Sequence, residues 1–502
     1  MERDRTMLHS LWRNIARENA SLPAVIDWRG EWTYGALTRA VDGIKQRLIS
    51  HVSGDTDLVT IVGPPSFLSV AALLAVLESG RAFNFQDPTD PPERVANILK
   101  LISAKIAIYT GNADAQLSAV VAKLGATRVV DVSDLAHPFF LDSHGHSPET
   151  LAVQAPESIA AIYMTSGSTG WPKAAALSHR ACSATLDRLR SDFSLGCGKR
   201  VFGQAPLCFD ISYWSVFIAL ESGGVLALPT AEVLSAPDAS ADFIRRWNLD
   251  YVNSVPSYLA HLLSASSLPE HPLPLKDVVL CGETLPMSLV REMRLCMPGG
   301  ARIWNQFGST ETPHIGFFDT ADASENDIRF TLTMDMSITV DGPELDGTGR
   351  LRVKGPCLFS GYLENGKLSD TSRIDNLTGY LSRDLGRLDE EGRLHFGGRI
   401  DRIVKYEGFL VNLVEIENTL GDYRSIQGVV AVVLEGPTEI GALIEAESKS
   451  LTKADVLSYA STVLPLASRP TVVSVVRNLP RNSSGKIDTD AALRLLSASR
   501  TV

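Results

Sequence analysis

Apolar and polar positions alternate in blocks along the first two thirds of the chain. Residues 58–111 read in turn as strand, helix, strand, helix and strand, because short apolar runs alternate with helix-length stretches. A second series of short apolar strands runs from Arg200 to about Phe318. This rhythm predicts largely parallel sheets that are covered by helices.

The hydrophobic pattern differs near the two ends of the chain. Residues 23–48 predict two short strands around an Arg29–Gly30 turn, followed by a helix that begins near Tyr34. After Asp319 the chain consists of short strands punctuated by glycine, which predicts antiparallel pairing. The C-terminal region, from about Arg399, predicts a small α+β domain with two helices on a short sheet.

We therefore expect an α/β fold in two domains. Residues 1–398 are predicted to form a large N-terminal domain of layered, largely parallel α/β subdomains plus a small antiparallel, barrel-like subdomain. Residues 399–502 are predicted to form a small C-terminal α+β domain. A chain of 502 residues is too long for one compact core, which agrees with this division.

Composition narrows the class of protein. With 44% hydrophobic and 21% charged residues, the chain is typical of an ordinary soluble globular protein. Its net charge of -11 argues against nucleic acid as a partner, since a nucleic-acid binder needs a basic face. The six cysteines show no paired metal spacing and no dense framework, so reduced thiols in the cytoplasm are the simplest interpretation.

The sequence predicts no role at a membrane. Its longest apolar stretch, residues 67–80, has the length of one buried helix and is too short to span a bilayer. The N-terminal residues carry charges of both signs, which is typical of an amphipathic helix and not of a signal peptide.

A loop of small residues, "TSGSTGWPK", gives the first indication of chemistry. It follows the strand-like stretch 159–164 and precedes a predicted helix. Small residues let backbone amides approach a ligand closely and hydroxyls add donors, so the loop is a natural phosphate cradle, with Lys173 supplying a positive charge. A flexible surface connection is the better interpretation for an isolated Ser/Gly run. The spacing does not fit a Walker loop, because Trp171 and Pro172 separate Gly170 from the lysine.

The loop resembles the phosphate loop of the adenylate-forming superfamily, which includes acyl-CoA synthetases, luciferases and the adenylation domains of nonribosomal peptide synthetases. Further motifs follow in family order: "FDISYW", "NQFGSTET", "GRLRVKGPCLFSGYL", "YLSRDLGRL", "GRIDRIVKYEGFLVNLVEIE" and "NSSGKID". Because the motifs are in register over nearly the whole chain, the sequence is identified as a member of this superfamily. The resemblance implies that a substrate carboxylate attacks the α-phosphate of ATP, giving an acyl-adenylate and pyrophosphate.

The resemblance also implies roles for individual residues around ATP. The residues that would surround the β- and γ-phosphates are Thr165, Ser166, Gly167, Ser168, Thr169, Gly170 and Lys173. Thr310 would lie near the α-phosphate, and Glu311 would hold Mg²⁺, which prefers oxygen ligands. The nucleotide pocket would further include Gly282, Glu283, Asn305, Phe307, Gly308 and Ser309, with Phe307 near the adenine.

Four more positions complete the implied machinery. Asp384 would hold both ribose hydroxyls, since a carboxylate accepts two donors at once, and Arg399 would support the ribose or phosphate side. Lys486 would bridge the substrate carboxylate and the ribose or phosphate oxygens, and is the expected catalytic residue. Asp401 matches the family's hinge, where a mobile C-terminal domain turns between the adenylating and the thioester-forming orientations.

The motif around Asp210 bears on the substrate. In amino-acid-activating relatives the matching aspartate pairs with the substrate ammonium group, and a carboxylate in an apolar pocket is costly without a cation. A helix-capping aspartate is the structural alternative. The resemblance assigns these pocket positions: Phe209, Asp210, Ile211, Trp214, Asn253, Val279, Cys281, Gln306, His314 and Ile315.

The expected substrate is a small or medium amino acid, for which a polar side chain such as that of threonine is one option. A D-alanine–carrier protein ligase, to which the Cys281-Gly282-Glu283 run is similar, and a β-amino acid-activating enzyme are the alternatives within the class. A ligand-binding relative that lost the reaction is the alternative outside catalysis. The intact positions Lys486, Asp384 and Glu311 argue against it.

The resemblance also implies a partner. Only fourteen residues follow Asp488, too few for a carrier domain, so a freestanding enzyme is expected that loads the phosphopantetheine thiol of a separate carrier protein. Coenzyme A is the alternative acceptor. The sequence departs from the family at Ser309, where proline is usual, at Ser382 and Arg383 before the ribose aspartate, and at Leu410. These departures affect the thioester side and leave the phosphate and metal positions intact.

Overall fold

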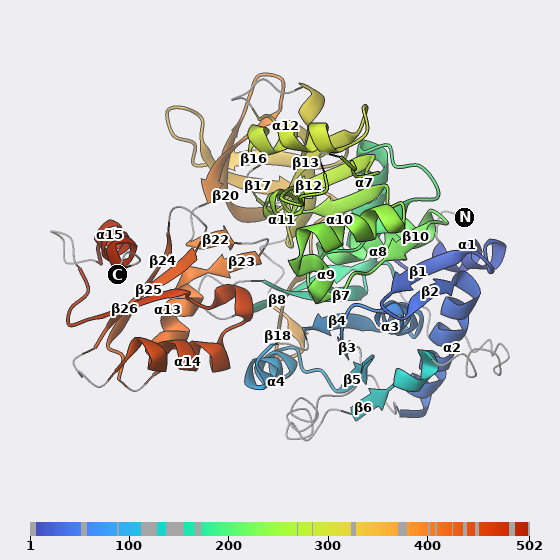
Figure 1. Ribbon diagram of the computed structural model, residues 1–502, viewed down its shortest axis with the longest axis horizontal. Coiled ribbons are helices and arrows are strands. Elements are labelled where there is room, and N and C mark those ends of the chain that lie inside the picture. Colours follow the sequence, from blue (N-terminus) through green and yellow to red (C-terminus); the bar gives the residue numbers. More distant parts are fainter. Residues whose placement is uncertain are drawn as a thin grey trace. The chain divides into compact units, whose positions relative to one another are not determined.

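A computed structural model describes most of the chain (Figure 1). The described residues are 7–51, 58–87, 90–111, 128–136, 155–165, 172–268, 270–283, 285–322, 328–369, 379–399, 402–406, 409–423, 425–434, 439–446, 451–480 and 487–499. The chain forms two compact units. The main unit comprises Met1–Pro88, Leu99–Met164 and Ala174–Gly398, and the C-terminal unit comprises Thr89–Ile98, Thr165–Lys173 and Arg399–Val502. The roles predicted for two separate domains stay predictions.

An eight-stranded sheet lies in the N-terminal part of the main unit. Its strand order is β19-β18-β8-β7-β4-β3-β5-β6, and the pairs from β7 through β4, β3 and β5 to β6 are parallel. The strands are β3 (Leu58–Val62), β4 (Ala82–Gln86), β5 (Ile106–Tyr109), β6 (Arg128–Asp131), β7 (Ile159–Thr165), β8 (Lys173–Ser178), β18 (Gly361–Glu364) and β19 (Lys367–Leu368). The antiparallel strand β18 comes from far along the chain and pairs with β8.

A nine-stranded sheet forms the second layer of strands. Its order is β15-β14-β13-β12-β11-β9-β10-β1-β2, parallel from β1 to β13 and antiparallel at both edges. The strands are β1 (Pro23–Asp27), β2 (Gly30–Thr33), β9 (Arg200–Phe202), β10 (Val225–Ala227), β11 (Tyr251–Ser254), β12 (Asp277–Cys281), β13 (Arg302–Ser309), β14 (Thr312–Asp319) and β15 (Thr331–Leu332). The largely parallel sheets predicted from the hydrophobic rhythm are confirmed.

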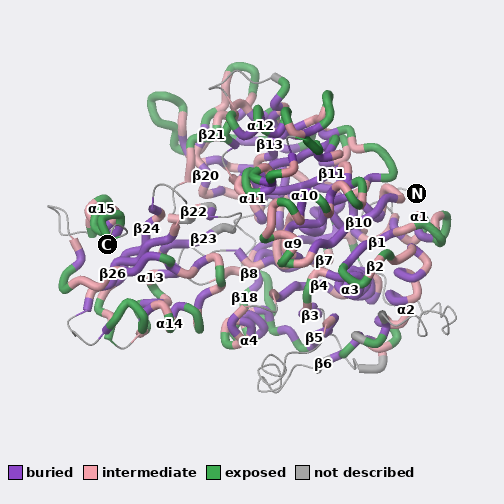
Figure 2. Tube along the Cα trace, viewed as in Figure 1, coloured by how far each residue is buried: buried purple, intermediate pink, exposed green. Residues whose placement is uncertain are grey.

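Helices bury the faces of both sheets (Figure 2). The helices α3 (Phe67–Glu78), α7 (His179–Asp192) and α8 (Ile211–Glu221) share one hydrophobic cluster with side chains of both sheets. Every residue of α3 from Phe67 to Leu77 is buried, as expected of a helix that is apolar on all sides. The helices α10 (Pro237–Arg246), α11 (Pro256–Leu263) and α12 (Met287–Cys296) form a second cluster with the opposite face of the nine-stranded sheet. The other α-helices that the structure describes before residue 400 are α1 (Trp12–Glu18), α2 (Tyr34–His51), α4 (Pro92–Leu101) and α9 (Ala231–Ser235).

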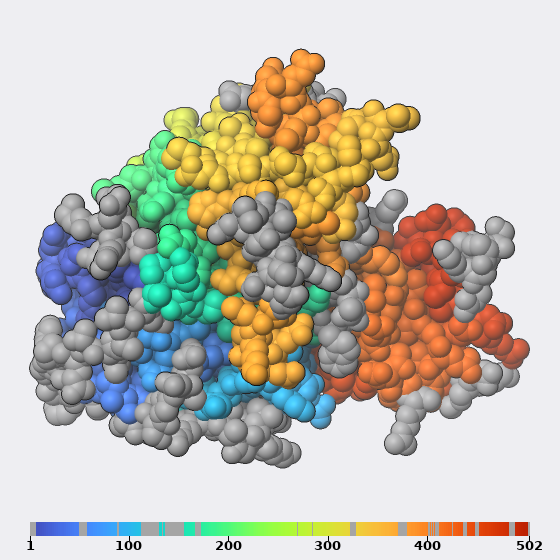
Figure 3. Space-filling view, turned by 180° about the vertical axis from the view of Figure 1, so that it is seen from behind, coloured from blue at the N-terminus to red at the C-terminus, as the bar shows by residue number. Residues whose placement is uncertain are grey.

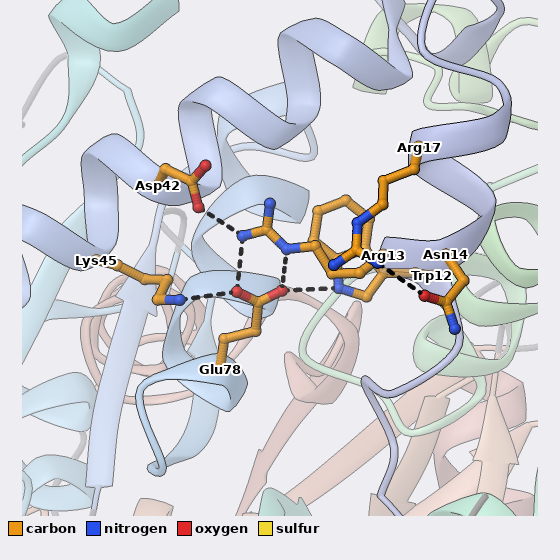
Figure 4. A network of polar contacts seen from close by, with 7 residues as sticks. All are labelled: Trp12, Arg13, Asn14, Arg17, Asp42, Lys45 and Glu78. Carbon is orange, nitrogen blue, oxygen red and sulfur yellow. Dashed lines mark hydrogen bonds and ion pairs between the residues drawn. The ribbon is translucent and has the colours of Figure 1, made fainter. Parts of the chain in front are cut away.

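One partly buried carboxylate connects three helices (Figure 4). Glu78, at the end of α3, accepts hydrogen bonds from Arg13 and Trp12 of α1 and from Lys45 of α2, at 2.7, 3.1 and 3.0 Å. Arg13 also pairs with Asp42 of α2 at 2.6 Å. The two cations hold the pKa of Glu78 below its ordinary value although burial acts in the opposite direction. The network fixes the N-terminal helix to the body of the main unit.

A second buried carboxylate joins the amino ends of three parallel strands. Asp277, the first residue of β12, is 2% exposed. It accepts a hydrogen bond from Nε of Arg302, the first residue of β13, at 2.7 Å, and one from Lys199, which directly precedes β9. The two cations offset the cost of burying the charge.

The antiparallel part of the main unit is an open sheet. Four strands pair in the order β16-β17-β20-β21, and the two outer strands do not pair with each other within the described residues. The strands are β16 (Ser337–Asp341), β17 (Gly349–Lys354), β20 (Tyr380–Leu388) and β21 (Leu394–Arg399). The expected barrel-like closure is therefore wrong, whereas the antiparallel pairing is confirmed. Glycine punctuation indicates tight turns, but it does not determine whether outer strands meet.

The C-terminal unit has its own sheet and its own core. The strand β25 (Glu439–Glu445) pairs antiparallel with β24 (Gly428–Leu434) and parallel with β26 (Val472–Val476). One face packs with α13 (Leu413–Gly421) and α14 (Lys453–Val463), and the other with α15 (Thr489–Ser499). A hairpin of β22 (Ile403–Tyr406) and β23 (Phe409–Asn412) precedes α13. From behind, the red atoms of this unit gather in one body (Figure 3).

In the described part of the chain, no helix combines the length and the apolar character needed to cross a membrane.

Candidate functional site

Four of the predicted substrate positions share one face of the nine-stranded sheet. Along β12, Val278 and Leu280 contribute to the cluster beneath α10–α12, whereas Val279 and Cys281 contribute to the cluster that contains α8. Because successive side chains of a strand point to opposite faces, Asn253 of β11 and Gln306 of β13 lie on the α8 face as well. Strand register aligns Asn253 with Val279 and Cys281 with Gln306.

Contacts around these residues connect the sheet to α8. Asn253 Nδ2 lies 3.5 Å from the carbonyl oxygen of Ile211, the first residue of α8, and Trp214 of the same helix is buried. Gln306 donates through Nε2 to the carbonyl oxygen of Pro313 at 2.7 Å, and the Cys281 thiol lies 3.6 Å from the carbonyl oxygen of Ser254. The polar groups near the carboxyl ends of β11–β13 therefore meet the amino end of α8, where open α/β sheets bind ligands.

Asp210 directly precedes α8, and its surroundings disfavour the ionised form of its carboxyl. Burial raises the pKa of its carboxyl from the ordinary 3.8 to about 6, and the nearby Glu311 carboxylate acts in the same direction. A hydrogen bond with the Thr310 hydroxyl and the backbone amide of Ile211, 2.9 Å from Oδ1, act in the opposite direction. Asp210 is therefore the N-cap residue of α8, as the structural alternative predicted. These hydrogen bonds do not fully offset the effect of burial on the carboxyl, whose pKa stays raised.

A chain of polar contacts continues from Glu311 toward the predicted ribose site. The Tyr362 hydroxyl donates to Glu311 Oε1 at 2.6 Å and lies 3.3 Å from the Tyr380 hydroxyl. Burial and the Glu311 carboxylate raise the pKa of both phenols, so both stay protonated. The charge of Asp384 also raises the pKa of Tyr380, and Asp384 itself is buried in β20. Asp210, Glu311 and Asp384 thus belong to one connected group of the main unit.

The hairpin between β13 and β14 presents Thr310 and Glu311 at its tip. Ser309 and Thr312 face each other across it, with their hydroxyl oxygens 3.0 Å apart. A Cβ atom at Gly308 would lie 2.4 Å from the carbonyl oxygen of Pro313, so only glycine fits there. The turn that presents the predicted metal residue therefore depends on a close backbone approach.

Other predicted nucleotide residues lie on both sides of this hairpin. Phe307 packs between Phe330 and Phe396, with ring centroids 5.2 and 5.1 Å away, and Asn305 is buried next to Leu280 in the sheet. Gly282 has a φ of +83°, which favours glycine.

Glu283 has a structural role in this structure. Its carboxylate accepts hydrogen bonds from the amide and the hydroxyl of Ser257, at 2.8 and 2.9 Å, in the first turn of α11. A carboxylate at a helix amino end is favourable. A contact of Glu283 with a nucleotide stays a prediction.

The last two predicted pocket residues lie in β14. His314 is fully buried and places Nε2 2.9 Å from Oδ2 of Asp192, the last residue of α7. Ile315 is buried in the cluster of the antiparallel sheet.

The structure also describes four further predicted residues. Phe209 lies in the turn before α8, Thr165 ends β7, Lys173 begins β8 and Arg399 ends β21. The remaining positions lie outside the described residues, and their roles stay predictions: Ser166, Gly167, Ser168, Thr169, Gly170, Asp401 and Lys486.

Three residues of the site were not predicted from the sequence. Tyr362 and Tyr380 stand inside the quoted motifs "FSGYL" and "YLSRD", so their positions could have been singled out. Asp192 ends an ordinary amphipathic helix, and no sequence signal indicates that it contacts His314.

Magnesium was predicted at Glu311. The described residues contain no group of three or more His, Cys, Asp or Glu side chains that could enclose a metal ion. Magnesium bound to a nucleotide is commonly held by one or two carboxylates together with phosphate oxygens. A single glutamate beside a predicted phosphate site fits that donor set.

Comparison with known proteins identifies the family. Residues 12–363 match the family described as AMP-binding enzyme. Phenyloxazoline synthase MbtB of Mycolicibacterium paratuberculosis is 27% identical over 508 residues, which cover 97% of this chain and 42% of MbtB. The L-proline–[L-prolyl-carrier protein] ligase of Streptomyces coelicolor is 29% identical over 428 residues, which cover 81% of this chain and 80% of that ligase.

The fold is also found among solved structures. The amide bond synthetase McbA from Marinactinospora thermotolerans superposes with a TM-score of 0.83 at 20% identity, covering 96% of this chain and 99% of McbA. The chain therefore belongs to the AMP-binding enzyme family. The predicted class, an ATP-dependent, AMP-forming ligase of the adenylate-forming superfamily, is confirmed at the level of the family. The chain spans less than half the length of MbtB, of which it covers 42%.

Proposed function

We propose that this chain activates a free amino acid as aminoacyl-AMP and transfers the aminoacyl group to the phosphopantetheine thiol of a carrier protein. The observation that supports an amino acid is the state of Asp210. Burial raises the pKa of this carboxyl to about 6, and the largest influences on it from the described residues include a second carboxylate, Glu311, and no cation. Asp210 is partly buried, and a partly buried carboxylate without a cation is costly, so a substrate ammonium group would supply the missing charge.

In the first step, an oxygen of the substrate carboxylate forms a bond to the α-phosphorus of ATP while the bond to pyrophosphate breaks. Negative charge is redistributed over phosphoryl oxygens, so positioning and electrostatic stabilisation are the main tasks of the protein. Thr310 and Lys173 would bind phosphate oxygens, Asp384 would bind the ribose, and Lys486 would stabilise the reacting carboxylate. Glu311 would hold Mg²⁺, which supplies positive charge next to the phosphates when bound.

In the second step, a thiolate attacks the acyl carbon and AMP leaves. The carrier protein as acceptor is supported by the similarity to the L-prolyl-carrier protein ligase, which this chain matches over 80% of that protein. Coenzyme A is the competing acceptor, because its thiol belongs to the same phosphopantetheine group.

Pyrophosphate exchange tests the first step. We would offer each amino acid, D-alanine and β-alanine next to the matched carboxylic acid that lacks the amine. We expect exchange with an amino acid at a kcat/KM at least about 100-fold above that of its deaminated analogue, because the analogue leaves Asp210 unpaired. A best substrate without an amine would contradict the proposal.

Thioester formation tests the second step. The adenylated substrate would be offered a phosphopantetheinylated carrier protein and free coenzyme A in parallel, with the product thioester detected by mass spectrometry. We expect transfer to the carrier protein. Loading of coenzyme A alone would overturn the choice of acceptor and leave the amino acid assignment intact.

A further inference from the structure

The N-terminal segment, residues 7–18, is attached to α7 through a histidine ring. The backbone amide of Leu8 donates a hydrogen bond to Nδ1 of His179, the first residue of α7, at 3.2 Å. Leu8 is 1% exposed, and His179 is completely buried. Because an amide nitrogen can only donate, Nδ1 is the unprotonated acceptor and the ring is neutral, with its proton on Nε2. This attachment therefore requires an uncharged His179.

The surroundings of His179 do not compensate a positive charge. Its Nε2 is buried and has no hydrogen-bond partner within the part of the chain that the structure describes. The ring of His9 lies edge-on to it, with the ring centroids 5.5 Å apart. Burial lowers the pKa of His179 to about 3, and the neighbouring His9 acts in the same direction. Protonation would thus bury an unpaired charge and break the bond to Leu8.

His9 is the second titratable ring of this contact. Burial lowers its pKa, the charges of Lys45 and Arg13 add to that shift, and the carboxylate of Glu78 opposes it. Glu78 already pairs with both of these cations, and Arg13 pairs with Asp42 as well (Figure 4). The carboxylate nearest to the two rings is therefore engaged elsewhere and offers a protonated His9 little compensation.

The helix of the segment depends on its attachment. α1 spans seven residues, and its N-cap residue Leu11 makes no side-chain capping bond. Isolated helices of that length are marginal in water. Trp12 and Ala16 of α1 are buried in the cluster that also contains α8. Residues 7–18 are therefore expected to lose their structure together when the segment leaves the rest of the main unit.

We propose that the attachment of residues 7–18 is pH-sensitive and that protonation of His179 releases the segment. The proton enters at Nδ1, the atom that accepts the bond from Leu8, so the charged ring and the attached segment exclude each other. Once the segment is released, the ring is solvated and takes up a proton with its ordinary pKa of 6.5. The attachment is therefore fully retained above that pH and is weakened progressively as the pH falls below it.

Hydrogen exchange of residues 7–18 in the full chain tests the proposal. Exchange would be measured by mass spectrometry between pH 8 and pH 5 and corrected for the intrinsic pH dependence of amide exchange. We expect the opening equilibrium of the segment to increase about 30-fold, because a ring with a pKa of 6.5 when open and about 3 when attached is protonated at pH 5 only when open. The strands β11–β13 should keep their protection. An opening equilibrium that does not change with pH would overturn the proposal.

His179→Asn separates the hydrogen bond from the charge. The amide oxygen of asparagine can accept the bond from Leu8 in place of Nδ1, but the amide does not titrate. We expect the increase between pH 8 and pH 5 to fall to about threefold or less. His261→Asn, which replaces an exposed histidine of α11, is the matched control and should keep the wild-type increase. An unchanged pH dependence in His179→Asn would contradict the role of His179.

His9→Asn distinguishes the two rings. We expect this variant to keep an increase of at least about tenfold, because the ring that accepts the bond from Leu8 is still present. If the pH dependence were lost in His9→Asn and kept in His179→Asn, His9 would be the controlling residue and the assignment would be wrong.

A spectroscopic measurement tests the same bond in the wild-type protein, even if a variant releases the segment at every pH. Long-range ¹H–¹⁵N correlation spectra distinguish the two nitrogens of a histidine, and the signals of His179 are assigned by their loss in His179→Asn. We expect the proton on Nε2 at pH 8. A proton on Nδ1 would show that the ring does not accept the bond from Leu8 and would overturn the proposal.

Discussion

Asp210 is a predicted substrate residue that also affects stability. Its pKa is about 6 in the folded protein and ordinarily 3.8, so the folded state binds this proton more tightly than the unfolded chain does. The free energy of unfolding therefore decreases as the pH rises from about 4 to about 6, and it stays reduced above that range. On the proposed function, a cationic substrate would offset the cost of this partly buried charge.

Asp210→Asn separates these two effects. Asparagine caps a helix as well as aspartate does but carries no charge. We expect the free energy of unfolding of the variant, measured with urea, to exceed that of the wild-type protein by about 1–3 kcal/mol at pH 8. The gain should be smaller at pH 5. Amino acid activation should decrease at least about 100-fold. A loss of stability at both pH values would show that capping, and not charge, is the main role of Asp210.

Tyr362 is the second residue whose removal is informative. Tyr362→Phe deletes the hydroxyl that holds Glu311 Oε1 at 2.6 Å and preserves the ring. Because a group behind a metal ligand orients that ligand, we expect the magnesium concentration for half-maximal pyrophosphate exchange to rise about tenfold. Tyr380→Phe, one hydrogen bond further from Glu311, is the control and should shift it less. An unchanged magnesium dependence in Tyr362→Phe would contradict the orienting role.

At the scale of elements, the hairpin of β13 and β14 is the part of the site most sensitive to shape. We expect Gly308→Ala to lower stability by about 1–3 kcal/mol, because the new methyl group would overlap the carbonyl oxygen of Pro313. Gly299→Ala adds the same methyl group where nothing lies within 4 Å, and its melting temperature should stay near that of the wild-type protein. Equal melting temperatures for all three proteins would show that the hairpin can relax.

The elements also show what could be predicted from the sequence. The strands β9–β13 were predicted because each is a short apolar run between turn residues, and α2 begins at Tyr34 as the pattern indicated. Which strands pair could not be predicted in the same way. Val25 of β1 lies opposite Leu226, and Tyr362 of β18 lies opposite Ala175, and no local pattern encodes partners so distant in the sequence.

In the candidate site, likewise, many residues could be predicted from the sequence, whereas their contacts could not. Family motifs located residues such as Asp210 and Glu311, because their spacing within a motif is visible in the sequence. The hydrogen bonds of Asp192 to His314 and of Glu283 to Ser257 depend on how helices pack against strands, and the sequence gives no sign of them. Burial, which sets the pKa of Asp210, is likewise a property of the folded chain.

At the scale of the whole molecule, the two units have separate hydrophobic cores. The clusters of the C-terminal unit draw all their buried residues from the chain after residue 400, and Leu496 of α15 is completely buried there. We expect Leu496→Ala to destabilise this unit by about 2–5 kcal/mol without loosening the main unit. Hydrogen exchange measured by mass spectrometry should increase in β24–β26 and in the helices α13–α15, and not in the main unit.

A matched substitution in the main unit completes that test. Leu220 of α8 is equally buried, and Leu220→Ala should increase exchange in the helices and strands around α8 while leaving β24–β26 protected. Increased exchange across both units in either variant would show that they unfold as one cooperative body.

The contacts of Asp277 with Lys199 and Arg302 have a consequence for how such a protein can diversify. Lys199, Asp277 and Arg302 connect β9, β12 and β13 at their amino ends, whereas Asn253, Cys281 and Gln306 stand near the carboxyl ends. The residues predicted to select the ligand can thus be exchanged far from the ion pairs that keep the strands aligned. Related proteins with this arrangement can change their chemistry at the carboxyl ends of the strands while the amino ends preserve the fold.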